Sequence, residues 1–358
     1  MSKKIIALLM AVMMIASLAA CSAPAETPAA TEAPAEAPAE APAEAPAEAP
    51  AKEPLRVAVQ SFYCSSMAQY IQDSGLLDEL DYEIEWLVFN GGAPINEAMG
   101  EWDVAVTGGA AVYALANYEC KLICHQVNGT DGNYIIARND DPILTAETPE
   151  EQAELLKGKT VLCTFGQTGH YTANLWLDSV GVDPSEVNLV NLEVANVYNS
   201  FVAGEGDYAV VTEPYCYYDM SEIGATVFAT LDSVGGALFE STVCTKAAYE
   251  NRYEDVVKFV QILFKATDAL NQDIDKAAES VSLWYENCGK TLTLEDAKTS
   301  LTGKPMIGSE EAKTITLGDF MNSYAAWFAS RELIDATGLE NVGKNIATDL
   351  YADAMAGL

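Results

Sequence analysis

Basic residues are scarce in this sequence. It contains 19 lysines and arginines against 53 aspartates and glutamates, which gives a formal net charge of −34 at pH 7. A chain of this charge repels the phosphates of nucleic acids and the anionic surface of a membrane, so neither is expected as a partner. Two long windows, 57–120 and 160–245, contain no lysine or arginine at all.

Long apolar runs are also missing after the first twenty residues, and a membrane span needs roughly 20 of them. The chain starts with Lys3 and Lys4, an apolar run over 5–16 and small residues before Cys21. This order is typical of a secretory signal, so we expect residues 1–20 to be a signal peptide. The cysteine after Leu-Ala-Ala resembles a bacterial lipobox. That resemblance implies cleavage before Cys21, diacylglycerol on its sulfur and a membrane anchor on the extracytoplasmic face. The alternative is an ordinary signal peptide with an incidental cysteine.

A disulfide framework is not indicated either. Seven further cysteines form an odd set without framework spacing: Cys64, Cys120, Cys124, Cys163, Cys216, Cys244 and Cys288. Most lie in apolar runs, where cysteine behaves as a small buried hydrophobe. Cys120, Cys124 and His125 are close enough to suggest a metal, but their segment has the pattern of a buried strand. We therefore predict no metal and no cofactor.

Low-complexity sequence follows the lipobox. Residues 34–50 repeat Pro-Ala-Glu-Ala, and regular prolines exclude helix and sheet. We expect residues 21–54 to be a lipidated cysteine followed by a disordered, extended stalk. Folded sequence begins near Leu55 and leaves about 300 residues, enough for two lobes.

The folded part alternates strands and helices. Strands are expected at 55–60, 82–89, 103–107, 121–127, 134–138, 160–164, 187–192, 208–212 and 237–245, with helices between them and a helical tail after residue 250. The pattern predicts an α/β protein with two mostly parallel sheets flanked by helices. Lobe 1 takes 55–138 and 239–358, and lobe 2 takes 139–238. Ligands of such sheets bind beyond the carboxyl ends of the strands, so a cleft between the two rims is expected.

The segment Thr107-Gly108-Gly109 is central to this prediction. It joins a buried strand to a helix and leaves backbone N–H groups unpaired at the helix start. The two glycines have no Cβ and let a ligand approach the backbone. The alternative is an ordinary turn between a strand and a helix.

Several runs together resemble the type II periplasmic solute-binding proteins, in the branch that serves nitrate, sulfonate, taurine and thiamine-pyrimidine ABC importers. They are G-G-A-P-I-N-E-A at 91–98, D-V-A-V-T-G-G at 103–109, L-K-G-K-T-V at 156–161, G-Q-T-G-H-Y at 166–171 and G-E-G-D-Y-A-V-V-T-E-P-Y at 204–215. The resemblance covers roughly residues 55–250. It implies two α/β lobes joined by two crossover strands and a hinge between them. It also implies a monomer that binds a small molecule and delivers it to an ABC permease with its ATPase.

The resemblance and the strand ends together give a set of candidate ligand-binding residues. They are Phe62, Tyr63, Ser65, Gly91, Gly92, Thr107, Gly108, Gly109, Gln167, Thr168, Gly169, His170, Asn196, Glu213 and Tyr215. His170 is either a tunable donor in the cleft or a surface histidine at a helix start. Glu213 either contacts the ligand or caps neighbouring backbone. The exit loop 62–66 departs from the proline-rich loop of many relatives, so ligand identity does not carry over.

Ligand charge is inferred from the two windows without lysine or arginine, because they contain every loop expected at the cleft. This favours a neutral or cationic ligand, aromatic and similar to a thiamine pyrimidine, held by tyrosine faces and a carboxylate. The alternative is a sulfonate, nitrate or taurine type of anion bound by helix N-termini.

Two other classes of function compete with transport. Cys64 and His170 can be drawn as a nucleophile and its base, but no third group orients them, and the clustered cysteines of the related single-use pyrimidine synthases are missing. We predict that the protein is not an enzyme. A surface adhesin or ligand sensor on the same fold remains the third reading.

Overall fold

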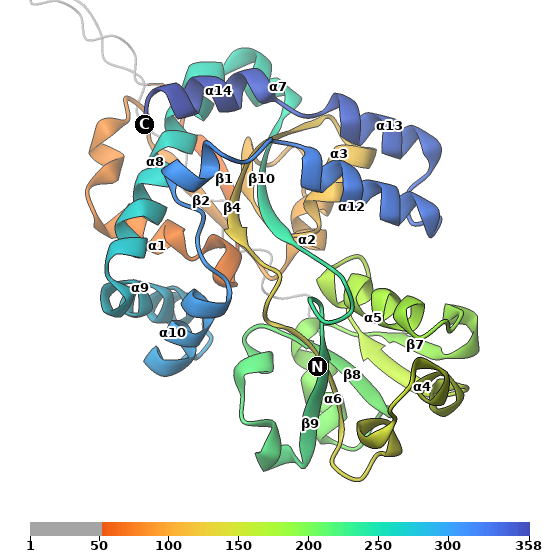
Figure 1. The fold of residues 1–358 in the computed structure, drawn as a ribbon. Coiled ribbons are helices and arrows are strands. Elements are labelled where there is room, and N and C mark those ends of the chain that lie inside the picture. Colours follow the sequence, from red (N-terminus) through yellow and green to blue (C-terminus); the bar gives the residue numbers. More distant parts are fainter. Residues whose placement is uncertain (1–51) are drawn as a thin grey trace, which may run out of the picture. The chain divides into compact units, whose positions relative to one another are not determined.

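The computed structural model describes residues 52–358. The expected signal peptide, Cys21 and nearly all of the expected stalk lie outside the described residues. The described chain builds two five-stranded sheets, each covered by helices (Figure 1). In the part of the chain that the structure describes, we find no helix with the length and apolar character that a membrane span requires.

The first sheet has the strand order β2-β1-β3-β10-β4. Its strands are β1 (Leu55–Gln60), β2 (Ile84–Phe89), β3 (Val104–Val106), β4 (Cys120–Asn128) and β10 (Phe239–Thr245). β1 pairs in parallel with β2 and β3, whereas β10 lies antiparallel between β3 and β4. Strands β1 and β3 are almost completely buried, as expected where helices cover both faces of a sheet.

The second sheet has the order β7-β6-β8-β5-β9. Its strands are β5 (Asn133–Arg138), β6 (Thr160–Cys163), β7 (Asn188–Asn191), β8 (Tyr208–Thr212) and β9 (Ala225–Thr230). β6 is parallel to β7 and β8, and β5 is antiparallel to β8 and β9, so residues 133–138, which were expected in lobe 1, lie in the second sheet. Alternate residues of β5 and β8 enter two separate apolar clusters, one under α5 (Thr168–Ser179) and one under α6 (Val194–Val202). The period of two places successive side chains on opposite faces.

Two crossover segments connect the sheets: 129–132 leads from β4 to β5, and 231–238 leads from β9 back to β10. They run beside each other, because the Gly129 N–H donates to the Leu238 carbonyl at 2.8 Å. A third segment, 304–307, lies against the end of β4. The Asn128 N–H donates to the Pro305 carbonyl at 3.0 Å, and the Ile307 N–H donates to the Gln126 carbonyl at 2.9 Å.

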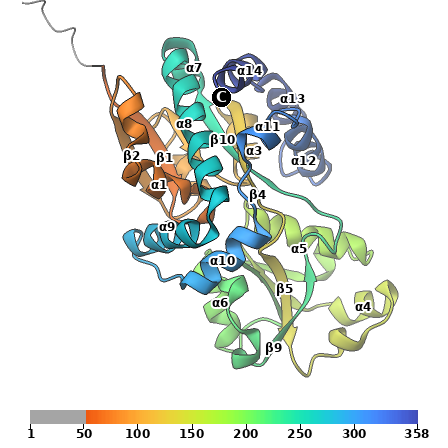
Figure 2. The ribbon, with the colours of Figure 1, turned by 60° about the vertical axis from the view of Figure 1, so that its left-hand side comes forward.

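The remaining helices cover both sheets, and Figure 2 shows α8, α9 and α10 from the side. Their bounds are α1 (Met67–Asp73), α2 (Gly92–Glu97), α3 (Ala111–Asn117), α4 (Pro149–Leu156), α7 (Lys246–Asn251), α8 (Tyr253–Gln272), α9 (Ile274–Asn287), α10 (Leu294–Gly303), α11 (Ser309–Ala312), α12 (Asp319–Ser330), α13 (Ala336–Lys344) and α14 (Thr348–Ala356). Short 3₁₀ turns occupy 63–65, 76–79, 142–145, 184–186, 215–217 and 220–223.

The sequence did not lead us to expect β9, α13 or the short helices α7 and α11. Among the described strands β9 pairs only with β5, and it is half exposed, so its apolar alternation is weak. α13 contains Gly338 and Gly343, which lower helix propensity. A Cβ on Gly338 would lie only 3.3 Å from the Ala116 Cβ, so this glycine lets α13 pack closely on α3. Tertiary contact therefore outweighs local propensity in α13.

Candidate ligand-binding site

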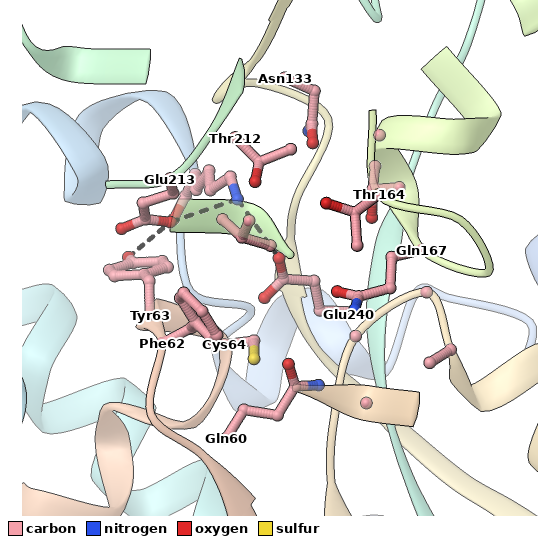
Figure 3. Close-up of a pocket in the computed structure, with 18 residues that line it drawn as sticks. Gln60, Phe62, Tyr63, Cys64, Asn133, Thr164, Gln167, Thr212, Glu213 and Glu240 are labelled. Atoms are coloured by element: carbon pink, nitrogen blue, oxygen red, sulfur yellow. Dashed lines mark hydrogen bonds and ion pairs between the residues drawn. The ribbon is translucent and has the colours of Figure 1, made fainter. Parts of the chain in front are cut away.

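A cavity of about 70 Å³ lies where the carboxyl ends of strands from both sheets meet. Figure 3 shows its lining side chains converging from the two sheets. The first sheet contributes the end of β1, the turn at the start of α2 and the turn between β3 and α3. The second sheet contributes the turn between β6 and α5, the start of α6 and the end of β8. Ligands of open α/β sheets bind at such strand ends.

Nine of the candidate residues line this cavity. On the first sheet's side they are Phe62, Tyr63, Gly92, Gly108 and Gly109. On the second sheet's side they are Gln167, Thr168, Gly169 and Glu213. The loops before α3 and α5 approach closely here, because a Cβ built on Gly109 would lie 3.4 Å from the Thr168 Oγ1.

Three candidates lie just behind the lining of the first sheet. The Ser65 hydroxyl donates to the Val106 carbonyl at 2.6 Å and accepts from the Gln60 N–H at 2.9 Å. The Thr107 hydroxyl accepts from the Gln60 side-chain amide at 2.6 Å. Ser65 and Thr107 therefore position Gln60, which lines the cavity. Gly91 lies beside Gln167, since a Cβ on it would be 3.4 Å from the Gln167 Nε2.

Three further candidates of the second sheet are also outside the lining. The His170 ring stacks on Phe165 with centroids 4.3 Å apart, and burial lowers the pKa of His170. Tyr215 stacks on Tyr198 at 5.3 Å. Asn196 is exposed in the first turn of α6. The lining does not include these three side chains.

The glycine turn before α3 offers fewer free donors than the sequence led us to expect. The Ala111 N–H donates to the Gly108 carbonyl at 3.1 Å, and the Val112 N–H donates to the Gly109 carbonyl at 3.3 Å. The first turn of α3 thus satisfies these two donors within itself. Gly108 still leaves open space, because only the Gln60 side chain comes within 4 Å of a Cβ built there.

The expectation that no basic side chain reaches the cleft is wrong. Lys304, which follows α10, lines the cavity and is 5% exposed. It comes from outside the two windows that lack lysine and arginine. The pairing of segment 304–307 with the end of β4 brings it there, because Val127 and Met306 form an antiparallel bridge. A contact between segments so far apart in the chain leaves no local pattern.

Glu213 lies in a buried polar network. Its Oε1 accepts from the Tyr285 hydroxyl at 3.2 Å and from the Ser300 hydroxyl at 2.9 Å, and its Oε2 lies 3.3 Å from the Lys304 Nζ. The Tyr285 oxygen in turn accepts from the Tyr63 N–H at 3.0 Å. Glu213 therefore connects the end of β8 to the exit loop of β1 and to helices α9 and α10.

Glu240 is the second carboxylate of the cavity and was not among the candidates. It lies near the start of β10, is 6% exposed, and its Oε1 is 3.4 Å from the Lys304 Nζ. Its Oε2 has no hydrogen-bond partner among the described residues. Burial raises the pKa of Glu240, and the nearby Glu213 adds to that effect against the attraction of Lys304. Burial alone would lower the pKa of Lys304, but the two carboxylates outweigh it and raise the pKa.

Cys64 lines the cavity as a protonated thiol. Burial raises its pKa well above the usual value, and a nucleophilic cysteine needs the opposite shift. Among the described residues no hydrogen bond joins Cys64 to His170. No cluster of three or more potential metal-ligating side chains occurs within residues 52–358.

Some of the missed lining residues had a signal in the sequence and others had none. Gln60 is the last residue of β1, and Thr164 directly follows β6. Both could therefore have been predicted as residues at the carboxyl ends of strands. Asn133 and Glu240 flank the crossovers, and Lys304 lies in an irregular segment. Their position depends on how the two sheets are connected.

Comparison with known proteins places these features in a family. Residues 48–284 match the model of a family described as the NMT1-like family. A "Putative ABC transporter periplasmic binding protein" of Brachyspira hyodysenteriae is 30% identical over 310 residues, covering 84% of this chain and 89% of that protein.

Solved structures share the fold at low sequence identity. The alkanesulfonate-binding protein SsuA of Xanthomonas axonopodis, bound to MOPS, superposes with a TM-score of 0.65 at 18% identity, covering 83% of this chain and 98% of that one. The nitrate-binding protein NrtA of Synechocystis gives a TM-score of 0.66 at 12% identity, covering 85% and 88%. At these identities the likeness establishes the two-lobed fold and not the ligand.

Proposed function

Because the chain belongs to the NMT1-like family, we propose that it is an extracytoplasmic solute-binding protein of an ABC importer. It captures a small organic solute between its two lobes and delivers it to the membrane permease, whose ATPase drives transport. It acts as a monomer without enzymatic activity, held at the membrane by lipid on Cys21.

The observation that supports this role best is the position of the cavity. Most of its lining comes from strand ends of both sheets, and within residues 52–358 only 129–132 and 231–238 connect those sheets as crossovers. A solute bound there contacts both lobes at once, so binding favours the conformation in which the lobes are together. A permease can recognise that conformation as the loaded state.

For the ligand we favour a neutral or cationic organic molecule with an aromatic part. Phe62 and Tyr63 give the cavity an aromatic side, while side-chain amides and hydroxyls such as Gln60, Gln167 and Thr164 offer hydrogen bonds. The two carboxylates outnumber the single lysine of the lining. The excess negative charge of the lining would stabilise a positive charge on the ligand and repel a negative one.

The alternative is a sulfonate, nitrate or taurine type of anion. Two observations favour it: Lys304 lines the cavity, and the Thr168 and Gly169 N–H groups at the start of α5 have no hydrogen-bond acceptor among the described residues. One observation counts against an anion. Lys304 already pairs with Glu213 and Glu240, so these two carboxylates balance its positive charge. An anion would have to displace one of these carboxylates.

A thermal-shift screen tests the proposal. Protein purified from cells that express the full chain is screened with alkylsulfonates, taurine, nitrate, thiamine-pyrimidine precursors and aromatic amines. A true ligand at about 100 times its Kd stabilises the protein by about 2.7 kcal/mol, which raises the Tm clearly. The Gly108→Leu variant places a side chain into the open space beside Gln60 and should lose that response.

The matched control is Gly343→Leu, which adds the same side chain at an exposed helical position where only Asn322 comes within 4 Å. It should respond as the unchanged protein does. A solute that stabilises Gly108→Leu to the same extent would show that the cavity is not the binding site.

A further inference from the structure

We propose that Glu240, with Glu213 and Lys304 behind it, forms a subsite for one small cationic N–H donor group, an ammonium or an amidinium, on the transported solute. This inference rests on the proposed function, because it assigns the chemistry of the same cavity. The main observation behind the inference is that one carboxylate oxygen of Glu240 has no hydrogen-bond partner among the described residues.

An unpartnered carboxylate oxygen in a buried position is unusual, because buried polar groups nearly always have a hydrogen-bond partner. The Glu240 side chain is 8% exposed, its residue lines the cavity, and its Oε2 has no partner in the described structure. Figure 3 shows the carboxyl group of Glu240 directed into the space between Gln60, Gln167 and Thr212. A ligand donor that reaches this buried oxygen from the cavity would satisfy it.

The charges of the three residues point to a cation. Lys304 lies 3.3 Å from a Glu213 oxygen and 3.4 Å from a Glu240 oxygen, so one positive charge serves two carboxylates. Glu213 is satisfied at both oxygens, since hydroxyl groups of α9 and α10 donate to the other one. Glu240 is therefore the carboxylate that a second positive charge would neutralise. A cationic group supplies the charge and the hydrogen-bond donor together.

The backbone around Glu240 holds the carboxylate in place. A Cβ built on Gly129 would lie 2.7 Å from the Glu240 Cγ and 2.8 Å from its Oε1. Gly129, in the crossover 129–132, thus lies at the point where the Glu240 side chain packs against the backbone. Because this side chain has little freedom to lose on binding, its carboxylate is preorganised for a ligand.

Protonation of Glu240 links binding to pH. Burial raises the pKa of Glu240, so its carboxyl group takes up a proton at a higher pH than an exposed glutamate does. A protonated Glu240 no longer attracts a cation. Affinity for a cationic probe should therefore fall as the pH is lowered through this raised pKa.

Pairs of probes with matched shape and different charge test the subsite. Guanidinium is compared with urea, and acetamidinium with acetamide, at concentrations below those that denature proteins; methanesulfonate serves as the anion. The cavity of about 70 Å³ suits groups of this size. We expect a rise in Tm with each cationic probe, a several-fold smaller response to its neutral partner, none to methanesulfonate, and a smaller cationic response at pH 5 than at pH 8.

Glu240→Gln removes the charge at nearly constant shape and should abolish the preference for the cationic member of each pair. Glu205→Gln, at an exposed position, is the matched control and should keep it. The inference is overturned if neutral or anionic probes stabilise the protein as well as the cations do. It is also overturned if Glu240→Gln retains the cationic response or if no cationic probe raises the Tm.

The two proposals can fail separately. A sulfonate that binds the unchanged protein and not Gly108→Leu would overturn the cationic subsite and leave solute capture standing. Conversely, guanidinium could bind in a Glu240-dependent way while deletion of the gene leaves solute uptake by the cells unchanged. That result would support the subsite and count against transport.

Discussion

Lys290 is partly buried, and burial disfavours its charge although two contacts favour it. Its Nζ lies 3.4 Å from the centroid of the Phe62 ring and donates to the Ser61 carbonyl at 2.8 Å. Burial lowers the pKa of Lys290 to about 8. Because the folded state binds fewer protons than the unfolded state between this pKa and the ordinary value of 10.5, the stability contributed by Lys290 rises with pH across that window.

This shift predicts selective chemical reactivity. At pH 8 about half of the Lys290 side chains are neutral, compared with under about 1% for an ordinary lysine. Limiting acetic anhydride at pH 8 should therefore modify Lys290 ahead of the exposed Lys344, as measured by peptide mass spectrometry. Equal rates at the two positions would mean that Lys290 keeps an ordinary pKa.

At the scale of elements, the rims of the two sheets are built by helices that start in close contact. Gly92 opens α2 against the start of α3, and a Cβ on it would lie only 2.4 Å from the Ala110 Cβ. Across the lobes, Tyr171 of α5 packs edge-on against Tyr324 and Trp327 of α12, with centroids 4.8 and 4.7 Å apart. These contacts fix where the cavity-lining turns lie.

Gly92→Ala should therefore destabilise the protein by about 1–3 kcal/mol, because α2 must move away from α3 to admit the methyl group. Gly108→Ala adds the same methyl group in open space and should change the free energy of unfolding by less than about 0.5 kcal/mol. Urea denaturation of both variants measures the difference. Equal stabilities would contradict the close contact between α2 and α3.

At the scale of the whole molecule, the acidic charge and the amino-terminal sequence bear on the proposed attachment to a membrane. A chain with a net charge of −34 is repelled by anionic lipid, so the proposed attachment to a membrane needs another source than the charge of the protein. A lipid on Cys21 would supply it, with residues 22–54 as the spacer to the folded lobes.

Cys21→Ala should release the protein from the membrane fraction into the soluble fraction, because the attachment site of the lipid is lost. Fractionation of cells and immunoblotting measure this. Cys288→Ala, which changes a cysteine of the folded part, should remain with the membrane. Membrane association of Cys21→Ala would remove the lipid anchor from the proposal.

The sequence by itself determined the alternation of strands and helices and the loops at the strand ends, because hydrophobic period and glycine turns are local properties. From these, Phe62, Gly92, Gly108, Gln167 and Glu213 could be placed near one site. Only the tertiary structure decided the charge of that site. Lys304 and Glu240 reach the cavity through the pairing of 304–307 with β4 and of β10 with β3 and β4. Such long-range pairing depends on the packing of the whole fold, and no short stretch of sequence encodes it.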